Sequence, residues 1–377
     1  MLDEINALIR PVWVEIDLQA IKTNIRKIKE LIGSEVQIMS VIKAEAYGHG
    51  AVKVAQIALE EGINWFGVAT PEEGIALRRA GINANILVLG PLLPNQVAAF
   101  CEYNLIGTIT MLESARALSL EACHRNVEMK IHIKIDTGMG RIGFYPGEAV
   151  EQIKKIAAFT NIKVDGLYSH FATADHSDLS YARKQLTVFN KLLFNLKEQG
   201  IKIPHIHLAN SAGIINLPDS YFKLVRAGII LYGLYPSSEV EKNRLSLKPA
   251  FALKTEVVQV KRVPAGTGIS YGQLYHTPKE TMIATLPIGY ADGLNRLLSG
   301  KTRVLIGGEF YPIVGMICMD QCMVDVGDAP VQVGDEVVLI GKQGAKEITV
   351  DEIASLLGTI NYEVVCMISH RVPRIYL

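Results

Sequence analysis

The chain has 377 residues, 49% of them hydrophobic, and its 38 basic and 38 acidic side chains cancel. This length favours two domains, and the balanced charge without basic runs argues against a nucleic-acid partner. No apolar stretch is long enough to span a membrane, and the N-terminal segment lacks the charged and then apolar pattern of a leader, so we expect a cytoplasmic protein.

From about residue 18 to 235, short apolar runs alternate with amphipathic helical patterns. The runs predict eight strands, at 37–43, 65–69, 86–90, 106–110, 130–136, 163–170, 205–210 and 224–233. Apolar spacings of three and four residues predict helices between them, including 52–61, 71–80, 112–125, 148–159 and 181–199. Because parallel strands need helical crossovers and closure removes both sheet edges, the pattern predicts an α/β fold with an N-terminal (β/α)8 barrel. An open doubly wound sheet is the alternative, but no G-x-G-x-x-G motif opens a helix after the first strand.

The pattern changes after Tyr235. A polar linker ending in Pro249 leads to runs rich in Val, Ile and Thr at 252–263, 281–287, 302–306, 321–326 and 336–340, with one helical pattern at 350–357. These runs predict a mostly β second domain. We therefore divide the chain into a barrel at 1–240 and a β domain at 241–377. Residues 1–17 contain an alternating run and are a candidate for pairing with the β domain.

In a (β/α)8 barrel, side chains at the carboxyl ends of the strands face one shared site. Lys43 ends the first predicted strand, where burial lowers the pKa of an amine and makes it a nucleophile toward an aldehyde. The same rim is predicted to hold Lys134, Asp136, Arg141, His170, Asn210, Ser211 and Arg226. Each has a plainer explanation, because a lysine that closes a strand usually only reaches solvent and a buried histidine is usually a satisfied core residue.

The loops after the last two predicted strands carry small residues, NSAG at 210–213 and AGI at 227–229. Such loops let backbone N–H groups approach a phosphate, and barrels often bind phosphate there. Pyridoxal 5′-phosphate, an aldehyde that carries a phosphate, fits both this cradle and Lys43. Arg226 can only donate hydrogen bonds, so opposite the pyridine nitrogen it would leave that nitrogen unprotonated and favour simple proton abstraction and return.

Across nearly its whole length the chain resembles the alanine racemase family of fold-type III pyridoxal-phosphate enzymes. The resemblance rests on the motifs VIKAEAYGHG, KIDTGMGRIGF, GLYSHFATAD, HLANSAG, VRAGIILYG, ISYG, LPIGYADG, ICMDQCM and NYEVVCMISHRVPR. The first motif departs from the family at Glu45, where Asn or Asp is usual.

The resemblance implies a two-base mechanism on a pyridoxal-phosphate aldimine. Lys43 would hold the cofactor and act as one base, and Tyr271, from the other subunit's β domain, would be the opposing base. Two bases are needed because one face of the substrate Cα loses a proton and the other receives one. Tyrosine is a poor base at neutral pH unless its pKa is lowered, and His170 with Arg226 is the expected relay.

The resemblance also assigns the remaining contacts. The implied cofactor-binding residues are Tyr47, Asn210, Ser211, Gly228, Ile229 and Tyr362, with His170 on the pyridine ring and Arg226 at its nitrogen. Arg141 and Met319 would meet the substrate carboxylate, with Asp320 beside them. Lys134 matches a position that many members carry as an N-carboxylated lysine, which orients the arginine equivalent to Arg141. Tyr290 and Tyr362 match an aromatic entrance that restricts substrates to small side chains.

The expected protein is therefore an alanine racemase, an isomerase that interconverts L-alanine and D-alanine and supplies D-alanine for peptidoglycan. A homodimer with shared active sites is implied, because Tyr271 and Met319 would have to reach a neighbour's barrel. Five cysteines without a CxxC pair predict reduced thiols and no structural metal.

Three rival interpretations remain. A metal-dependent barrel hydrolase would use the pair His205-x-His207, but Pro204 marks the strand's beginning and places His205 at the wrong end of the barrel. A pyridoxal-phosphate carrier without turnover would not need a second domain that bears Tyr271. A decarboxylase of the same architecture would carry an acid in place of Arg226 and ordinarily a cysteine in place of the tyrosine.

Overall fold

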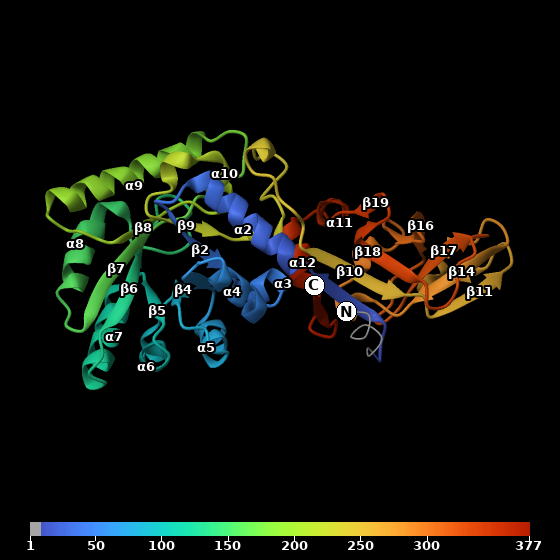
Figure 1. Ribbon diagram of the computed structural model, residues 1–377, viewed down its shortest axis with the longest axis horizontal. Helices are drawn as coiled ribbons and strands as arrows, with labels where there is room; N and C mark the ends of the chain where they lie inside the picture. Colours follow the sequence, from blue (N-terminus) through green and yellow to red (C-terminus); the bar gives the residue numbers. More distant parts are fainter. Residues whose placement is uncertain (1–8) are drawn as a thin grey trace. The chain divides into compact units, whose positions relative to one another are not determined.

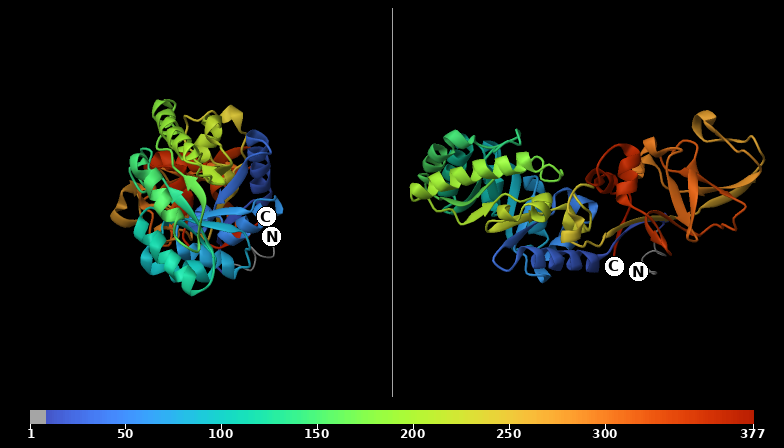
Figure 2. Two further views of the ribbon diagram at one scale, coloured as in Figure 1. Left: turned by 90° about the vertical axis from the view of Figure 1, so that its left-hand side faces the viewer. Right: turned by 90° about the horizontal axis from the view of Figure 1, so that it is seen from above.

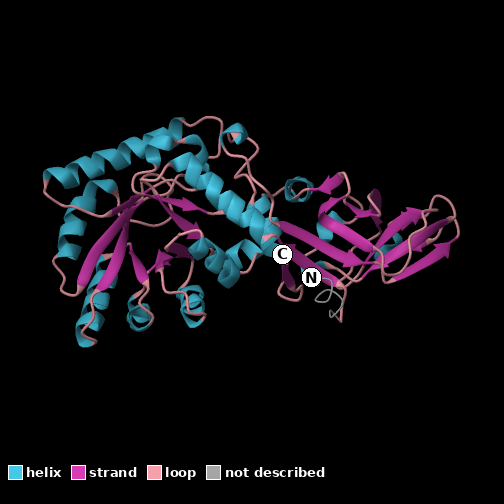
Figure 3. Cartoon of the chain, viewed as in Figure 1, coloured by secondary structure: helices cyan, strands magenta, loops and turns pink. Residues whose placement is uncertain are grey.

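The computed structural model describes residues 9–377, which form two compact units. The β unit contains the described residues up to Gln19, the short segment Tyr47–His49 and Pro249–Leu377. The barrel unit contains Ala20–Ala46 and Gly50–Lys248. Each unit has its own sheet, and strands dominate the β unit whereas strands and helices alternate in the barrel unit (Figure 3).

The barrel unit is built on eight parallel strands. They are β2 (Gln37–Val41), β3 (Trp65–Val68), β4 (Asn85–Pro91), β5 (Ile106–Ile109), β6 (Met129–Lys134), β7 (Ile162–Tyr168), β8 (His205–His207) and β9 (Leu224–Ala227). The order β8-β7-β6-β5-β4-β3-β2-β9 is that of a barrel opened between β8 and β9. Two backbone bonds bridge that seam, from Arg226 N to Ala209 O at 2.9 Å and from Lys223 N to Ile206 O at 3.4 Å. The prediction of an N-terminal (β/α)8 barrel is confirmed.

Helices follow the strands and lie outside them, as α7, α8 and α9 do beside β5, β6 and β7 (Figure 1; Figure 2, left). The helices are α2 (Leu18–Ile32), α3 (Lys43–Gly48), α4 (Ala51–Glu60), α5 (Pro71–Arg79), α6 (Val97–Glu102), α7 (Leu112–His124), α8 (Pro146–Ala157), α9 (Ser180–Glu198) and α10 (Ser211–Asn216). Short 3₁₀ turns add η1 (Pro94–Gln96), η2 (Pro218–Ser220), η3 (Ile229–Tyr232) and η4 (Lys242–Arg244). The predicted final strand at 224–233 therefore ends at Ala227, where Gly228 turns the chain into η3.

The barrel interior combines an apolar layer with three histidines. Met39, Trp65, Leu87, Ile106, Tyr168 and Leu224 pack together as buried residues. His132 and His207 are buried beside them, and the His205 ring meets Trp65 at 4.7 Å between centroids. The His132 ring lies so close to the backbone of β7 that Gly166 has no room for a side chain.

The β unit is a largely antiparallel sheet in the order β11-β14-β17-β16-β15-β18-β10-β1-β20, with β19 on β18 and a separate β12–β13 pair. Its strands are β1 (Val12–Ile16), β10 (Phe251–Glu256), β11 (Gln259–Val263), β12 (Gly268–Ile269), β13 (Tyr275–His276), β14 (Thr281–Leu286), β15 (Arg303–Ile306), β16 (Glu309–Val314), β17 (Cys322–Gly327), β18 (Glu336–Gln343), β19 (Lys346–Ile348) and β20 (Arg374–Tyr376). Its helices are α11 (Val350–Leu357) and α12 (Asn361–Met367), with the 3₁₀ turns η5 (Tyr271–Gln273), η6 (Tyr290–Asp292) and η7 (Arg296–Leu298). The predicted mostly β second domain is confirmed.

One predicted strand of the β unit is two. The run at 252–263 breaks after Glu256, because β10 pairs with β1 and β18 whereas β11 pairs with β14. At the break, Val257 N donates to Asp335 O and Val258 N donates to Thr285 O, so the chain changes sheet partners within two residues.

The units divide between Lys248 and Pro249, not after residue 240 as predicted. Asn24, fully buried on α2, holds the linker on the barrel unit: its Oδ1 accepts the N–H of Lys248 at 2.8 Å, and its Nδ2 donates to the carbonyl of Lys248 at 2.8 Å and to that of Leu231 at 3.0 Å. Of the segment 1–17, residues 1–8 lie outside the described residues, and Val12–Ile16 forms β1 of the β unit. Among the helices of residues 9–377, none has the length and apolar character to cross a bilayer.

Gly166→Ala tests the packing of the barrel interior. A Cβ at Gly166 would lie 2.5 Å from three ring atoms of the buried His132, so something must shift. We expect the free energy of unfolding to fall by about 1–3 kcal/mol, the usual cost of overpacking, seen as a lower urea midpoint at unchanged slope. Gly147→Ala is the control, because nothing lies within 4 Å of its position in α8 and alanine favours the helix there. Equal midpoints for the two variants would contradict the expectation.

Candidate active site

Lys43 stands directly after the carboxyl end of β2, but the strand does not reach it. β2 ends at Val41, and the predicted strand 37–43 is wrong in its last two residues. Ala44, Glu45, Ala46 and Tyr47 all have φ between 50° and 55°, so α3 is a left-handed turn. Left-handed backbone costs L residues about 1–2 kcal/mol each, so the surrounding structure must hold this turn in place.

Several contacts hold the left-handed turn. In the barrel unit, Ala46 N donates to Ile42 O at 2.9 Å, Gly50 N donates to Glu45 O at 2.8 Å and Ala44 N donates to Glu73 Oε1 at 2.7 Å. In the β unit, Gly48, which ends the turn with φ 83°, packs closely against the backbone of Val365. A Cβ at Gly48 would lie only 2.5 Å from the Val365 carbonyl oxygen. Strain of this kind is concentrated at functional sites.

Arg226 is a buried guanidinium in β9, and four acceptors surround it. Its Nη2 lies 2.9 Å from Ser169 O, 3.0 Å from Leu208 O and 3.1 Å from His170 Nδ1, and its Nη1 lies 2.9 Å from His207 Nδ1. Burial lowers the pKa of Arg226 to about 10, so it remains charged at neutral pH. The expected pairing of His170 with Arg226 is present in the barrel unit.

Arg226 fixes the protonation of the histidines around it. A guanidinium only donates, so Nδ1 of both His170 and His207 must accept, which leaves each ring proton on Nε2. His207 Nε2 can then donate to His132 Nδ1 at 2.9 Å. Burial, followed by the charge of Arg226, holds the pKa of His170 and of His207 well below 6.5, and burial lowers the pKa of His132 to about 3. All three rings are therefore neutral at physiological pH.

The predicted cationic residues gather around His170. After burial, the charges that lower its pKa are, in order, those of Arg226, Lys134, Arg141 and Lys43. Lys134 is buried, donates to Ile135 O at 2.8 Å and lies 5.4 Å from the centroid of the Tyr168 ring. Burial and then Arg226 lower its pKa to about 7. The structure thus brings four of the predicted basic side chains to one rim of the barrel.

Two predicted polar residues act mainly on their own loops. Asp136 Oδ1 accepts the N–H groups of Gly138 at 2.9 Å and Gly140 at 3.1 Å. Burial raises the pKa of Asp136, but these bonds outweigh it and the net shift is downward. Asn210 caps α10 by accepting the N–H of Gly213 at 2.9 Å. Both residues therefore shape the loops that carry Arg141 and Ser211.

The two small-residue loops are tied together as a phosphate cradle requires. Ser211 Oγ accepts the N–H of Gly228 at 2.9 Å, which joins the loops after β8 and β9 and leaves the hydroxyl proton available to an acceptor. Ile229 follows at the start of η3. An amine at Lys43, a pure donor at Arg226 and this cradle supply the donor set that the aldehyde, ring nitrogen and phosphate of pyridoxal phosphate require.

The β unit carries Tyr271, Met319 and Asp320 on its surface. Tyr271 is 72% exposed and Met319 is 53% exposed, and both line one surface pocket with Asp320. Ser270, with φ 65°, donates from Oγ to Met316 O at 2.6 Å and so fixes the loop before Tyr271 against the loop before Met319. Asp320 is held by Arg371 at 2.7 Å.

A separate aromatic pair lies elsewhere in the β unit. The rings of Tyr47 and Tyr362 lie 5.9 Å apart at an angle of 55°. Tyr290, the other predicted entrance residue, is partly exposed at the start of η6.

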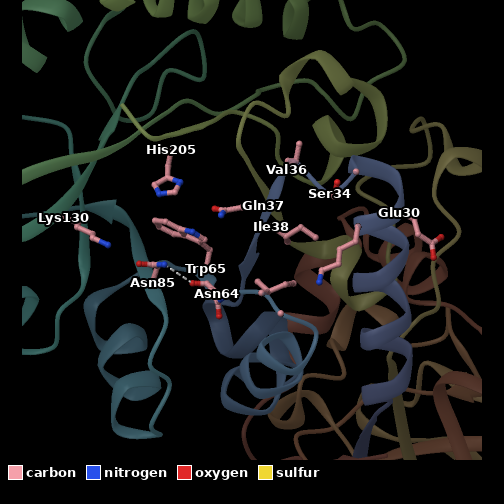
Figure 4. Close-up of a pocket in the computed structure, with 14 residues that line it drawn as sticks. Glu30, Ser34, Val36, Gln37, Ile38, Asn64, Trp65, Asn85, Lys130 and His205 are labelled. Atoms are coloured by element: carbon pink, nitrogen blue, oxygen red, sulfur yellow. Dashed lines mark hydrogen bonds between the residues drawn. The ribbon is translucent and has the colours of Figure 1, made fainter. Parts of the chain in front are cut away.

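A pocket of the barrel unit lies at the amino ends of the strands, the end opposite to Lys43 (Figure 4). Its lining includes Gln37, Trp65, Asn85 and His205, which are the first residues of β2, β3, β4 and β8. His205 therefore lies away from Lys43 and Arg226, as its position after Pro204 predicted. Within residues 9–377, no group of three or more His, Cys, Asp and Glu side chains is arranged to hold a metal ion.

Sequence reasoning missed three residues of the site. Glu73 binds the residue after Lys43, His207 binds Arg226, and Tyr168 stacks on His207 at 4.6 Å between ring centroids with a 5° angle. The pair His205-x-His207 drew attention only as a metal ligand. Strand alternation does place His207 inside the barrel, and that signal could have linked it to Arg226.

Both units of the chain match known proteins. The N-terminal domain of alanine racemase matches residues 16–236, and its C-terminal domain matches residues 250–376. Alanine racemase of Desulforamulus reducens is 50% identical over 97% of this chain and 99% of its own, and that of Clostridium novyi is 48% identical over 98% and 96%. The solved structure of alanine racemase from Clostridium difficile 630 superposes with a TM-score of 0.95 at 44% identity, covering 98% of this chain and 96% of that one.

These matches span both units and nearly the full length of each relative. The chain belongs to the alanine racemase family, whose cofactor is pyridoxal 5′-phosphate.

Proposed function

We propose that the protein interconverts L-alanine and D-alanine, with pyridoxal 5′-phosphate held at Lys43, and supplies D-alanine for peptidoglycan in the cytoplasm. The observation that carries this proposal is the buried Arg226, whose guanidinium is fixed among four acceptors beside neutral His170. When bound, the cofactor withdraws electrons from the substrate Cα and so acidifies its proton. The rest of the chemistry falls to residues of this chain.

Arg226 sets how strongly the ring withdraws electrons. Its pKa of about 10 keeps the guanidinium protonated, so it would donate a hydrogen bond to the ring nitrogen of a bound cofactor without giving up its proton. This moderate pull suits the removal and return of a proton better than reactions that need a long-lived carbanion. An acid at this position, as in the rival decarboxylase, would keep the ring nitrogen protonated and strengthen the withdrawal of electrons by the ring.

Lys43 and Tyr271 are the proposed bases on the two faces of the Cα. Tyr271 belongs to the β unit and is exposed there together with Met319 and Leu274, which is 76% exposed. Apolar and aromatic side chains exposed on one pair of loops are typical of an interface. We therefore propose a homodimer in which this surface completes the active site of the other subunit.

Arg141 and Met319 are the proposed substrate-carboxylate contacts, with Asp320 beside them, and Tyr290 and Tyr362 the proposed entrance. Ser211, Gly228 and Ile229, with Asn210 as their capping neighbour and Tyr47 and Tyr362 from the β unit, are the proposed phosphate site. The Ser211–Gly228 bond supports the part of this assignment that lies in the barrel unit.

Tyr271→Phe tests the assignment of the bases. Because the two alanine enantiomers have equal free energies, loss of one base slows racemisation equally in both directions, by a factor on the order of 10²–10⁴. Exchange of the Cα proton with deuterated water separates the bases. The variant should still exchange D-alanine, through Lys43, faster than L-alanine, whereas Lys43→Ala should exchange neither. Tyr145→Phe is the control, because Tyr145 is also 72% exposed but lies in the barrel unit. Equal exchange of both enantiomers by Tyr271→Phe would refute the asymmetry.

Mixing two inactive variants tests the shared active site. When Lys43→Ala and Tyr271→Phe chains are co-expressed, each hybrid dimer has one intact site only if the two bases come from different subunits. Random pairing then restores about a quarter of wild-type activity. Each variant expressed alone gives the baseline. Activity that stays at this baseline after mixing, with hybrid dimers demonstrated by mass spectrometry, would show that both bases come from one chain.

Lys134 is proposed to be N-carboxylated, and its lowered pKa makes this testable. The neutral amine attacks carbon dioxide, an N–C bond forms and one proton leaves. Burial and Arg226 bring the pKa of Lys134 to about 7, so the reactive neutral form prevails above pH 7 and is lost below it. In ¹³C-bicarbonate we expect a carbamate carbon signal above pH 7 that disappears on acidification and in Lys134→Arg. Lys130→Arg, changed on the same strand at an exposed site, should keep the signal. A signal that persists in Lys134→Arg would place the modification elsewhere.

A further inference from the structure

Glu73, in the first turn of α5, joins the loops that follow β2 and β3. Its Oε1 accepts the N–H of Ala44 at 2.7 Å, and its Oε2 accepts the N–H groups of Ala69 at 2.6 Å and Thr70 at 3.3 Å. All four residues belong to the barrel unit. One half-buried carboxylate therefore serves the residue directly after Lys43 and the end of the neighbouring strand.

The position of this carboxylate is fixed by its own helix. Thr70 caps α5, Pro71 occupies its first turn, and Glu73 closes a capping box by reaching back to the backbone of Thr70. The box explains why the sequence needs Thr-x-x-Glu here, but it uses only Oε2. Oε1 is turned the other way, toward Ala44, and the helix cap alone does not require that bond.

Ala44 is the first residue of the left-handed turn, with φ 50°. Its N–H belongs to the peptide group that Lys43 shares with Ala44, so the orientation of this peptide sets the direction in which the Lys43 side chain leaves the backbone. Neither Ala nor Glu favours a left-handed conformation, so the turn depends on contacts from outside. The hydrogen bond from Ala44 N–H to Glu73 is such a contact, at the end of the turn that follows Lys43.

We propose that Glu73 is a positioning residue for Lys43, because its carboxylate binds Ala44 N–H and holds the lysine-bearing peptide in the left-handed turn. The inference rests on the proposed role of Lys43 as the residue that holds the cofactor. Without the bond, the peptide relaxes and the amine is misplaced relative to both the cofactor carbonyl and the substrate Cα. Misplacement of a reacting group by about 1 Å costs on the order of 10²-fold in rate.

Glu73→Gln tests the proposal with little change of shape. Glutamine has one acceptor oxygen where glutamate has two, so the amide cannot serve both Ala44 and the Ala69–Thr70 backbone. We expect kcat to fall about 10- to 100-fold with KM for alanine changed by less than about threefold. A second readout needs no turnover: pyridoxal phosphate should attach to the cofactor-free protein more slowly by a similar factor, followed by its absorbance and trapped at Lys43 by borohydride reduction.

Two controls separate positioning from helix stability and charge. Thr70→Ala removes the other half of the capping box but leaves the carboxylate at Ala44, so it should lower the unfolding midpoint as Glu73→Gln does while kcat and the attachment rate stay near wild type. Glu72→Gln removes an exposed neighbouring charge from the same turn and should change neither kcat nor the attachment rate. Glu73→Asp keeps the negative charge but has a side chain one methylene shorter, so its carboxylate cannot reach Ala44 and attachment should slow as in Glu73→Gln. This variant replaces Glu73→Gln in the test if the glutamine protein does not fold.

The outcomes distinguish this proposal from the one on which it rests. Slower attachment and lower kcat in both Glu73 variants, with Thr70→Ala near wild type, support the positioning role. Wild-type attachment and kcat in a folded Glu73→Gln or Glu73→Asp protein overturn it, as does an equal loss in Thr70→Ala. If reduction labels no cofactor at Lys43 in the wild-type protein, the proposed role of Lys43 fails and the positioning role fails with it.

Discussion

The burial of one guanidinium is the constraint on which the barrel site depends. A charge removed from water must be surrounded by partners, and Arg226 finds them at the ends of two other strands: Ser169 and His170 after β7, and His207 and Leu208 in and after β8. These bonds lie beside the seam that Arg226 N closes with Ala209 O. Arg226 therefore contributes both to closing the barrel, through its backbone, and to the proposed donor for the cofactor ring, through its side chain.

The same guanidinium organises the electrostatics of the rim. Burial, and then the charges of Arg226, Lys134, Arg141 and Lys43, lower the pKa of His170 and keep it neutral. The fixed positive charges of Arg141 and Arg226 are complementary to the phosphate and carboxylate groups that a pyridoxal-phosphate enzyme for amino acids must bind. The centroid of the Tyr168 ring lies 5.4 Å from Lys134 Nζ and 5.3 Å from Arg226 Cζ. Its aromatic face therefore offers a contact for cations without adding a negative charge.

Sequence patterns predicted the barrel and the mostly β second domain because both depend on periodic burial, and periodic burial appears in the sequence as regularly spaced apolar residues. They missed α12, and they missed β16, in which Pro312 is atypical of a strand. The left-handed turn after Lys43 was invisible, since Ala-Glu-Ala favours a right-handed helix and external contacts impose the opposite hand. Motifs predicted roles for Lys43, Arg226 and His170, whereas the contacts of Glu73 with Ala44 and of His207 with Arg226 were found only in the structure.

The pairing of β1 with β10 has a consequence for biosynthesis. Val12 of β1 lies opposite Thr255 of β10, its antiparallel partner, so β1 is synthesised roughly 240 residues before β10. The parallel partner of β1, β20, is synthesised later still. The whole barrel sequence is synthesised in between, and its contacts between consecutive strands are local enough to form first. During that interval β1 is an unpaired strand, exposed to mispairing or to chaperones, and the order of translation makes the N-terminal strand among the last to reach its native neighbours.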